Sequence, residues 1–273
     1  MKKILFFLCF FSPLVGNALS YHVEKVGPHV VHIVAIDPTK HTLSVVDAHG
    51  QSVGEVAQKM KALAAINGGF FNAKFAPVGA FKKKGRWISP PQKNRGALGW
   101  TTMAHPIFGR LATKAWPHYQ NILGGAPLLI ANGKKVTDMS PEKTSKSFGK
   151  RHARTAVCTL PNNHWLWVLV DHTESSKRKM VRKFHHLKKE LPKNFSIETL
   201  IAAPPMESAP SLGMTLKELQ NFLHGKGCTW ALNLDGGTSS TLYYEGHIKN
   251  NTAGLQTFQS KPAQGVSTML ILK

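Results

Sequence analysis

The residues best suited to chemistry form one short segment that follows an apolar run. The segment begins with a carboxylate, continues with two glycines and ends with three hydroxyl side chains, Asp235-Gly236-Gly237-Thr238-Ser239-Ser240. Glycine lacks a Cβ atom, so its backbone N–H groups can approach a ligand closely, and a concave row of such donors suits phosphate oxygens. A tight turn would explain the carboxylate and the glycines, but not three consecutive hydroxyls. We therefore predict that this segment has a functional role.

Two further glycine loops share part of this pattern. The first, Asn67-Gly68-Gly69, is followed by two phenylalanines whose rings suit either the core or the face of a sugar. The second, Gly124-Gly125, leads into an apolar run at 126–130. A plain turn explains each loop about as well as ligand binding does. We include both loops, with residues 236–240, among the predicted substrate-binding residues.

Two charged residues lie at the ends of expected strands. Arg154 enters an apolar run at 153–159, where a guanidinium group is costly unless it pairs with a carboxylate or a phosphate. Asp171 follows the apolar run at 165–170. Polar groups at strand ends gather where strands converge on a site, but they also form ordinary turns. Arg154 favours a functional role on these grounds, and Asp171 is consistent with either role.

Other catalytic patterns fit poorly. The chain has fourteen histidines, yet it has no His-Glu-x-x-His motif and no cysteine–histidine spacing typical of a metal site. It also lacks a Gly-x-Ser-x-Gly elbow and a Walker loop. We predict no metal ligands and no cofactor, while a divalent cation stays an open alternative.

The elements that must position these residues alternate along the chain. Ser52 and Glu55, and later Thr215 and Glu218, have the spacing of a capping box that opens a helix. Each expected helix is followed by a strand, a polar residue and two glycines, which suggests two similar units facing one cleft.

The remaining expected elements are mostly strands. β-Branched runs at 30–36 and 41–46 predict a hairpin, and buried strands are expected at 126–130, 153–159, 165–170 and 230–234. Short strand-like pieces fill 79–123, and a basic amphipathic helix is expected after Ser176. This alternation without a long linker predicts one α+β domain, a mixed sheet core with packed helices.

The amino-terminal residues predict export. A basic start, an apolar run at 4–16 and small residues up to Ser20 are typical of a signal peptide over 1–20, which leaves a domain at 21–273. A membrane anchor is disfavoured because the run is short and contains Pro13. We expect a periplasmic or secreted protein with no transmembrane segment after cleavage. Cys158 and Cys228 then remain and can pair, although the sequence does not fix their distance.

The charge of the chain favours anionic partners. Lysine and arginine exceed aspartate and glutamate by 21, and the pI is about 10.1. Phosphorylated glycans, acidic polymers, membrane surfaces and nucleic acid all suit this charge, and so does a general basic bias of the proteome. Because the expected basic helix has an apolar stripe and a solvated charged face, we expect no nucleic-acid partner.

Taken in chain order, these motifs resemble the phosphodiester glycosidase family. The resemblance rests on Asn67-Gly-Gly-Phe-Phe, Gly124-Gly-Ala-Pro, Arg154-Thr-Ala-Val, Asp171 and Leu234-Asp-Gly-Gly-Thr-Ser-Ser-Thr-Leu, and it extends from about Val31 to Leu272. The chain departs from the family where it has Cys158 and Thr238 in place of glycines, and where His172 follows Asp171.

The resemblance implies a hydrolase that cleaves the sugar–oxygen side of a sugar phosphodiester, giving free sugar and a phosphomonoester. A phosphomonoester is already a good leaving group, so a pair of acid/base carboxylates is less necessary than in other glycosidases. Arg154 and the glycine loops would then stabilise the phosphate, and Asp235 would act as base or nucleophile. Asp171 would be a second carboxylate or would hold Arg154. A phosphodiesterase that attacks phosphorus and a non-catalytic binder of anionic glycan or cell-wall polymer are the alternatives.

Overall fold

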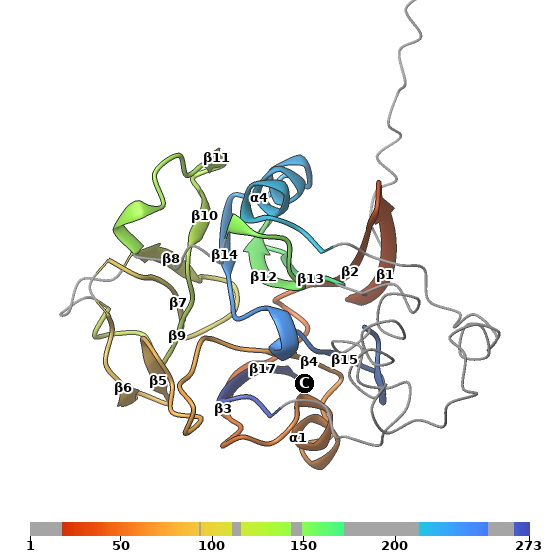
Figure 1. Ribbon diagram of the computed structural model, residues 1–273. Helices are drawn as coiled ribbons and strands as arrows, with labels where there is room; N and C mark the ends of the chain where they lie inside the picture. Colours follow the sequence, from red (N-terminus) through yellow and green to blue (C-terminus); the bar gives the residue numbers. More distant parts are fainter. Residues whose placement is uncertain (1–17, 93, 111–115, 143–148, 172–212, 251–264) are drawn as a thin grey trace, which may run out of the picture.

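The protein is described by a computed structural model that covers residues 18–92, 94–110, 116–142, 149–171, 213–250 and 265–273. This part of the chain consists mainly of β-strands in three sheets (Figure 1). Every strand pairing within the sheets is antiparallel.

The first sheet has seven strands. In spatial order they are β1 (Leu19–Val26), β2 (His29–Ile36), β13 (Trp165–Val170), β12 (Arg154–Thr159), β14 (Trp230–Asn233), β10 (Leu128–Ala131) and β11 (Lys134–Lys135). All residues of β12 and β13 are buried. These central strands are therefore covered on both faces, and β13 is a continuous apolar run.

The second and third sheets have five strands each. The second has the order β16 (His247–Ile248), β15 (Leu242–Tyr244), β4 (Ala64–Asn67), β17 (Thr268–Leu272) and β3 (Leu43–Asp47). The third has the order β6 (Arg86–Ser89), β5 (Phe81–Lys83), β9 (Asn121–Gly124), β7 (Gly96–Trp100) and β8 (Ile107–Arg110).

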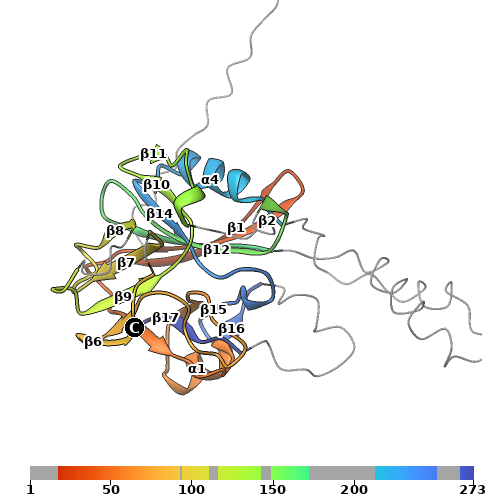
Figure 2. The same ribbon diagram turned by 60° about the vertical axis from the view of Figure 1, so that its left-hand side comes forward.

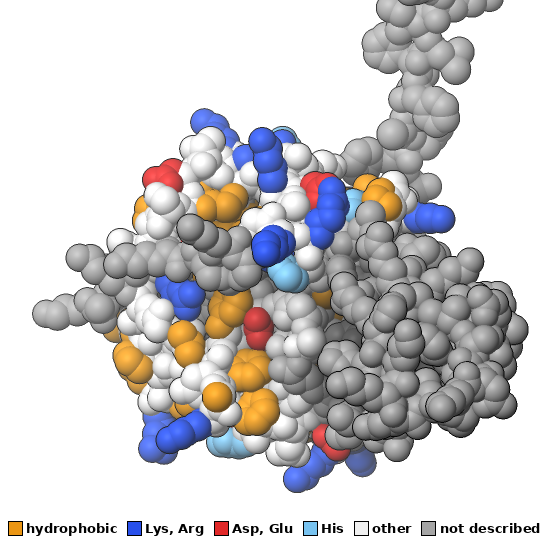
Figure 3. Space-filling model, in the orientation of Figure 1, with side chains coloured by type: hydrophobic (Ala, Val, Ile, Leu, Met, Phe, Trp, Pro, Cys, Tyr) orange, Lys and Arg blue, Asp and Glu red, His pale blue; other side chains and the backbone are white. Residues whose placement is uncertain are grey.

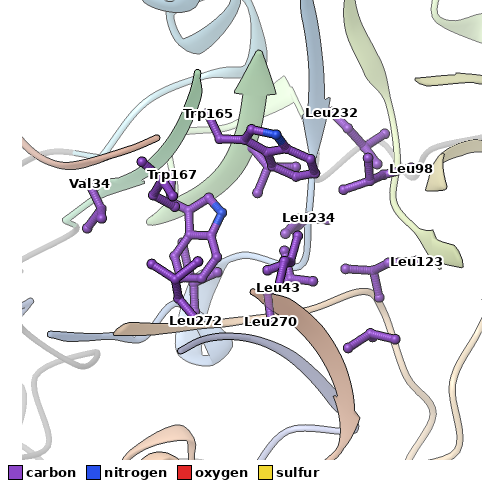
Figure 4. Packing of buried hydrophobic residues seen from close by; sticks show 14 of the residues in the cluster. Val34, Leu43, Leu98, Leu123, Trp165, Trp167, Leu232, Leu234, Leu270 and Leu272 are labelled. Atoms are coloured by element: carbon purple, nitrogen blue, oxygen red, sulfur yellow. The ribbon is translucent and has the colours of Figure 1, made fainter. Parts of the chain in front are cut away.

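The three sheets share one hydrophobic core. Trp165 and Trp167 from β13 meet leucines of the second and third sheets, such as Leu270 and Leu98 (Figure 4). The helix α4 (Leu216–Gly225) covers the opposite face of the first sheet, and α1 (Val53–Lys59) packs on the second sheet (Figure 2). Two short 3₁₀ helices, η1 (Ser140–Glu142) and η3 (Gly237–Ser239), complete the described elements.

Both predicted capping boxes are confirmed. The Ser52 hydroxyl accepts a hydrogen bond from Glu55 N, and the Glu55 side chain accepts one from Ser52 N. Thr215 and Glu218 make the same reciprocal pair at the start of α4. The four backbone N–H groups at a helix start lack intrahelical partners, so these pairs fix where α1 and α4 begin.

The predicted α+β class is wrong, because the described part of the chain is mostly strand and holds only two α-helices. Residues 79–123 account for much of the difference between the expected and the observed share of sheet. Their short strand-like pieces, separated by Gly, Pro and basic turns, form the whole third sheet. The predicted hairpin is also wrong, since β2 pairs with β1 and β13 whereas β3 pairs with β17 in another sheet.

Several expectations fall at or beyond the edge of the described part. Residues 1–17 of the expected signal peptide, the expected basic helix and His172 lie outside it. β1 begins at Leu19, so the expected cut after Ser20 would remove the first two residues of this strand. Among the described helices, none has the length and apolarity needed to span a membrane.

Cys158 and Cys228 form a disulfide across a sequence separation of 70 residues. Cys158 lies on β12 and Cys228 follows α4, and both are buried in the cluster between the first sheet and this helix. The bond therefore fastens the α4–β14 connection to the centre of the first sheet.

We expect loss of this disulfide to lower the free energy of unfolding by about 2–5 kcal/mol, because the bond closes a long loop in the unfolded chain. Thermal unfolding with and without reductant measures the effect. The Cys158→Ala/Cys228→Ala variant is the control and should melt at the same temperature in both buffers. Equal melting of the native protein in both buffers would contradict a structural role for the bond.

Candidate active site

The three predicted catalytic residues lie near one end of three neighbouring strands. Arg154 begins β12 and pairs with Val170, the last residue of β13, which Asp171 follows. On the other side, Leu234 N donates to Thr155 O at 2.8 Å, which extends the pairing of β14 with β12. Gly237 N then donates to Ala153 O at 2.9 Å, so Asp235 lies between two backbone contacts with the residues that flank Arg154. Residues far apart in sequence thus converge because β13, β12 and β14 are adjacent in the sheet.

Asn67 connects the second sheet to this strand end. It is the last residue of β4 and is fully buried. Its Oδ1 accepts hydrogen bonds from the Thr155 hydroxyl at 2.9 Å and from Thr241 N at 3.1 Å, and its Nδ2 donates to Asp235 O at 2.8 Å. Because buried polar groups are strongly held by such bonds, Asn67 fixes the position of the Asp235 backbone.

The Asp235 side chain lies in a partly buried, polar setting. Its Oδ1 accepts a hydrogen bond from Gly236 N at 2.9 Å. Burial raises the pKa of this carboxyl group to about 6, although hydrogen bonds from Ser239 and Gly236 act in the opposite direction. A carboxyl group with a pKa this close to neutrality suits proton transfer.

Arg154 is a buried cation held by backbone carbonyl groups. Its Nε donates to Met214 O at 2.8 Å and its Nη2 donates to Lys150 O at 2.7 Å. Burial lowers the pKa of the guanidinium group to about 10, so Arg154 stays charged at neutral pH. The two carbonyl bonds fix its orientation beside the strand end.

Asp171 belongs to a chain of hydrogen bonds that the sequence did not reveal. Its Oδ2 lies 3.0 Å from Nε2 of His32, and Nδ1 of His32 lies 2.8 Å from the Tyr21 hydroxyl. All three groups are satisfied when neutral His32 donates to Asp171 and accepts from Tyr21. Burial and the charge of Asp171 raise the pKa of Tyr21 to about 12, so its hydroxyl stays a donor. The available signal was His32, a polar residue inside the apolar run of β2.

Most of the predicted glycines allow backbone segments to pack against one another. A Cβ atom at Gly69 would lie 2.3 Å from Gly124 O, at Gly125 2.4 Å from Asn233 O, and at Gly236 2.7 Å from Ala153 O. Gly68 and Gly124 are similarly close to Thr268 and Ala80. Gly237 differs, since it has a φ of +62° and open space at its Cβ position. Close contact between strand ends thus explains five of the six glycines without a ligand.

The three hydroxyls after the glycines have different surroundings. Thr238 is exposed, whereas Ser239 and Ser240 are buried. Ser239 hydrogen bonds to the Asp235 carboxyl group, and the Ser240 hydroxyl lies 3.2 Å from that of Thr155. Ser239 and Ser240 therefore stabilise the loop, and Thr238 has the exposed hydroxyl.

Two adjoining hollows lie beside the other glycine loops. They share Val78, Gly79, Ala80 and Gly124 in their lining. Gly69 lines one hollow, and Gly125 and Arg95 line the other. Gly125 also packs against Asn233, which lies two residues before Asp235 in the chain. Within the described residues, no group of three or more His, Cys, Asp or Glu side chains is placed to hold a metal ion.

A family model for phosphodiester glycosidases matches residues 60–191 and 200–273. The chain belongs to the phosphodiester glycosidase family. The match covers every predicted site residue, from Asn67 to Ser240. No curated protein sequence matches the chain significantly.

Solved structures share the fold of this phosphodiester glycosidase family member. A protein from Synechocystis is 18% identical, with a TM-score of 0.69 over 93% of this chain and 61% of that chain. The zebrafish N-acetylglucosamine-1-phosphodiester α-N-acetylglucosaminidase catalytic domain, auto-inhibited by its pro-peptide, is 17% identical, with a TM-score of 0.67 over 94% of this chain and 84% of that chain. A Burkholderia pseudomallei protein assigned as exported is 15% identical, with a TM-score of 0.58 over 89% of this chain and 74% of that chain. This chain thus spans less than two thirds of the Synechocystis protein.

The raised pKa of Asp235 predicts that its charge destabilises the fold. The folded carboxyl group binds a proton more tightly than the unfolded one, so its stabilising contribution is present below about pH 4 and is lost as the pH rises through 6. Asp235→Asn cannot ionise, so we expect its free energy of unfolding to exceed that of the native protein by about 1–2 kcal/mol at pH 7.5, with the gap closing at pH 4.

Chemical denaturation at the two pH values measures this difference. Asp138→Asn is the matched control, because hydrogen bonds from Ser140 lower the pKa of Asp138. The control should therefore not stabilise the protein at pH 7.5. A loss of stability in Asp235→Asn at neutral pH would show that the charged form is favoured after all.

Proposed function

We propose that the protein is an exported hydrolase that cleaves the sugar–oxygen bond of a sugar phosphodiester, releasing free sugar and a phosphomonoester. The observation that carries this proposal is the convergence of Asp235 and Arg154 on adjacent strand ends in a member of the phosphodiester glycosidase family. A carboxylate and a fixed cation are the two groups that this reaction needs.

Arg154 has the properties of a phosphate-stabilising residue. Its guanidinium group is charged and held by Met214 O and Lys150 O. A preorganised cation stabilises the negative charge that develops on the departing phosphate without reorganisation during the reaction. Gly237, with its open Cβ position, and the exposed Thr238 hydroxyl are the nearby groups of the Asp235 loop that can approach a ligand.

Asp235 is the proposed base or nucleophile. At neutral pH a carboxyl group with a pKa of about 6 is mostly ionised, so it can attack the anomeric carbon or accept a proton from water. Ser239 and Gly236 donate to it and Asn67 fixes its backbone, which limits the orientations available to the carboxylate. Asp171, one residue beyond the partner of Arg154, is the candidate for a second carboxylate, oriented by His32.

Hydrolysis in ¹⁸O-labelled water distinguishes this mechanism from the phosphodiesterase alternative. We expect the label in the released sugar, because attack at the anomeric carbon breaks the carbon–oxygen bond and leaves all four original oxygens on the phosphorus. Mass spectrometry of the two products measures its position, and Asp235→Asn, with the fold retained, should lose turnover at least about a hundredfold. Label in the phosphate would support the phosphodiesterase. Binding of a sugar phosphodiester without turnover by the native protein would support the non-catalytic binder.

Export is supported by two independent features of the chain. Residues 1–20 have the composition of a signal peptide, and disulfides such as Cys158–Cys228 persist mainly in oxidising compartments. We expect a mature periplasmic or secreted protein that begins near Tyr21. Amino-terminal sequencing of the protein from the extracytoplasmic fraction measures this, and an intact Met1 on protein confined to the cytoplasm would contradict export.

A further inference from the structure

The edge of the third sheet carries an exposed apolar pair that has no role in the proposed chemistry. Trp87 and Ile88 are 39% and 45% exposed, and they are neighbours on β6. They account for two of the five large hydrophobic side chains that are exposed in the described part of the chain. Because successive strand residues point to opposite faces of a sheet, we take Trp87 as the contact residue, since exposed tryptophan is typical of binding surfaces.

The charged residues in the sequence around this pair are all basic. None of the fourteen acidic residues lies between positions 56 and 137, whereas lysine or arginine occupies thirteen positions in that stretch. Lys84 and Arg86, in the hairpin that joins β5 to β6, are both exposed. Glu142 contacts this sheet through Gly96 N and Arg110, on β7 and β8 near the opposite edge. Figure 3 shows hydrophobic and basic side chains gathered over β5 and β6, at the lower left of that view. An anionic partner therefore meets no nearby repulsive carboxylate from the sheet itself.

The side chain of Lys82 contacts one face of the Trp87 indole ring. Nζ of Lys82 lies 5.5 Å from the ring centroid and donates to Pro117 O at 2.7 Å, and Lys82 is only 4% exposed. This buried ammonium group stabilises one face of the ring by a cation–π interaction. A ring already fixed in position loses less conformational entropy when a ligand binds.

The exposed hairpin also adjoins the candidate active site. The Ser89 hydroxyl, at the end of β6, donates to Pro77 O at 3.2 Å. Pro77 lines one of the two hollows, together with Gly69 and Gly124. The hairpin therefore lies beside this shallow hollow and the glycine loops that line it.

We propose that the β5–β6 hairpin is an accessory binding site for an anionic glycan, in which a sugar ring stacks on Trp87 and acidic groups of the glycan contact Lys84 and Arg86. The inference rests on the proposed function, because that reaction supplies a substrate with both sugar rings and phosphate charges. Single-stranded nucleic acid is less well matched, since it uses successive stacking rings and β6 exposes one. The hairpin would thus give the enzyme a preference for phosphodiesters attached to a polymer.

Binding to a mannan that bears sugar-1-phosphodiester groups tests the proposal, with the same mannan stripped of phosphate as reference. We expect Trp87→Ala and Lys84→Glu/Arg86→Glu each to raise the Kd for the phosphorylated polymer about tenfold. Trp87→Phe should keep most of the affinity. Val23→Ala and Lys134→Glu/Lys135→Glu, on the first sheet, are the matched controls and should bind as the native protein does. Melting temperatures check that each variant is folded.

Turnover of a small soluble sugar phosphodiester separates this proposal from the proposed function. Trp87→Ala should hydrolyse the small substrate at the native rate while its activity on the polymer falls. Absence of turnover in the native protein would contradict the proposed hydrolase activity. The polymer-binding measurements would still show whether the hairpin binds an anionic glycan. Equal affinity of all variants, or tighter binding of the native protein to anionic lipid vesicles or an oligonucleotide than to the phosphorylated mannan, would overturn the accessory site.

Discussion

The candidate site depends on the buried side chain of Asn67. Its Oδ1 accepts hydrogen bonds from the Thr155 hydroxyl, in the first sheet, and from Thr241 N, which precedes β15 in the second sheet. Its Nδ2 donates to the backbone carbonyl of Asp235. Asp235 N in turn donates to Gly68 O. Removing such an amide would leave several buried polar groups unsatisfied at once, each costing roughly 1–3 kcal/mol. The carboxylate is therefore placed by the joint between two sheets and not by its own loop alone.

A second buried asparagine repeats the donor half of this arrangement, although its Oδ1 has no hydrogen-bond partner among the described residues. Asn233 ends β14 as Asn67 ends β4, and its Nδ2 donates to Ala126 O and to the carbonyl of its own neighbour, Leu234. Asn67 likewise donates toward Gly68 O at 3.4 Å. The internal repetition expected from the sequence is therefore present, but Asn67 corresponds to Asn233 and not to Asp235. Asp235 lies two residues farther along, which is why it can reach the strand end occupied by Arg154.

Local signals predicted local structure well. The capping boxes and the runs that became β12, β13 and β14 depend on neighbours within a few residues, so they could be recognised directly. The assignment of strands to sheets depends on long-range pairing, and β2 and β3 went to different sheets despite a turn-like connection. For the same reason, the roles of His32 and Tyr21 were not predicted. Nothing near them in sequence indicates a contact with the Asp171 carboxylate, which lies 139 residues away from His32. The glycines were found, but their contacts with distant backbone segments were not visible in the sequence.

The close packing of strand ends and the raised pKa of Asp235 have a common origin. Gly125 lets its loop approach Asn233 O, and Gly236 lets the Asp235 loop approach Ala153 O. Larger residues would separate these segments and admit water beside the carboxylate. Burial is the largest influence on the pKa of Asp235, so the glycines act on the chemistry through the environment of this group even where they touch no ligand. Close backbone packing thus accounts for these glycines, and Gly237 and Thr238 are the part of the motif with open space around them.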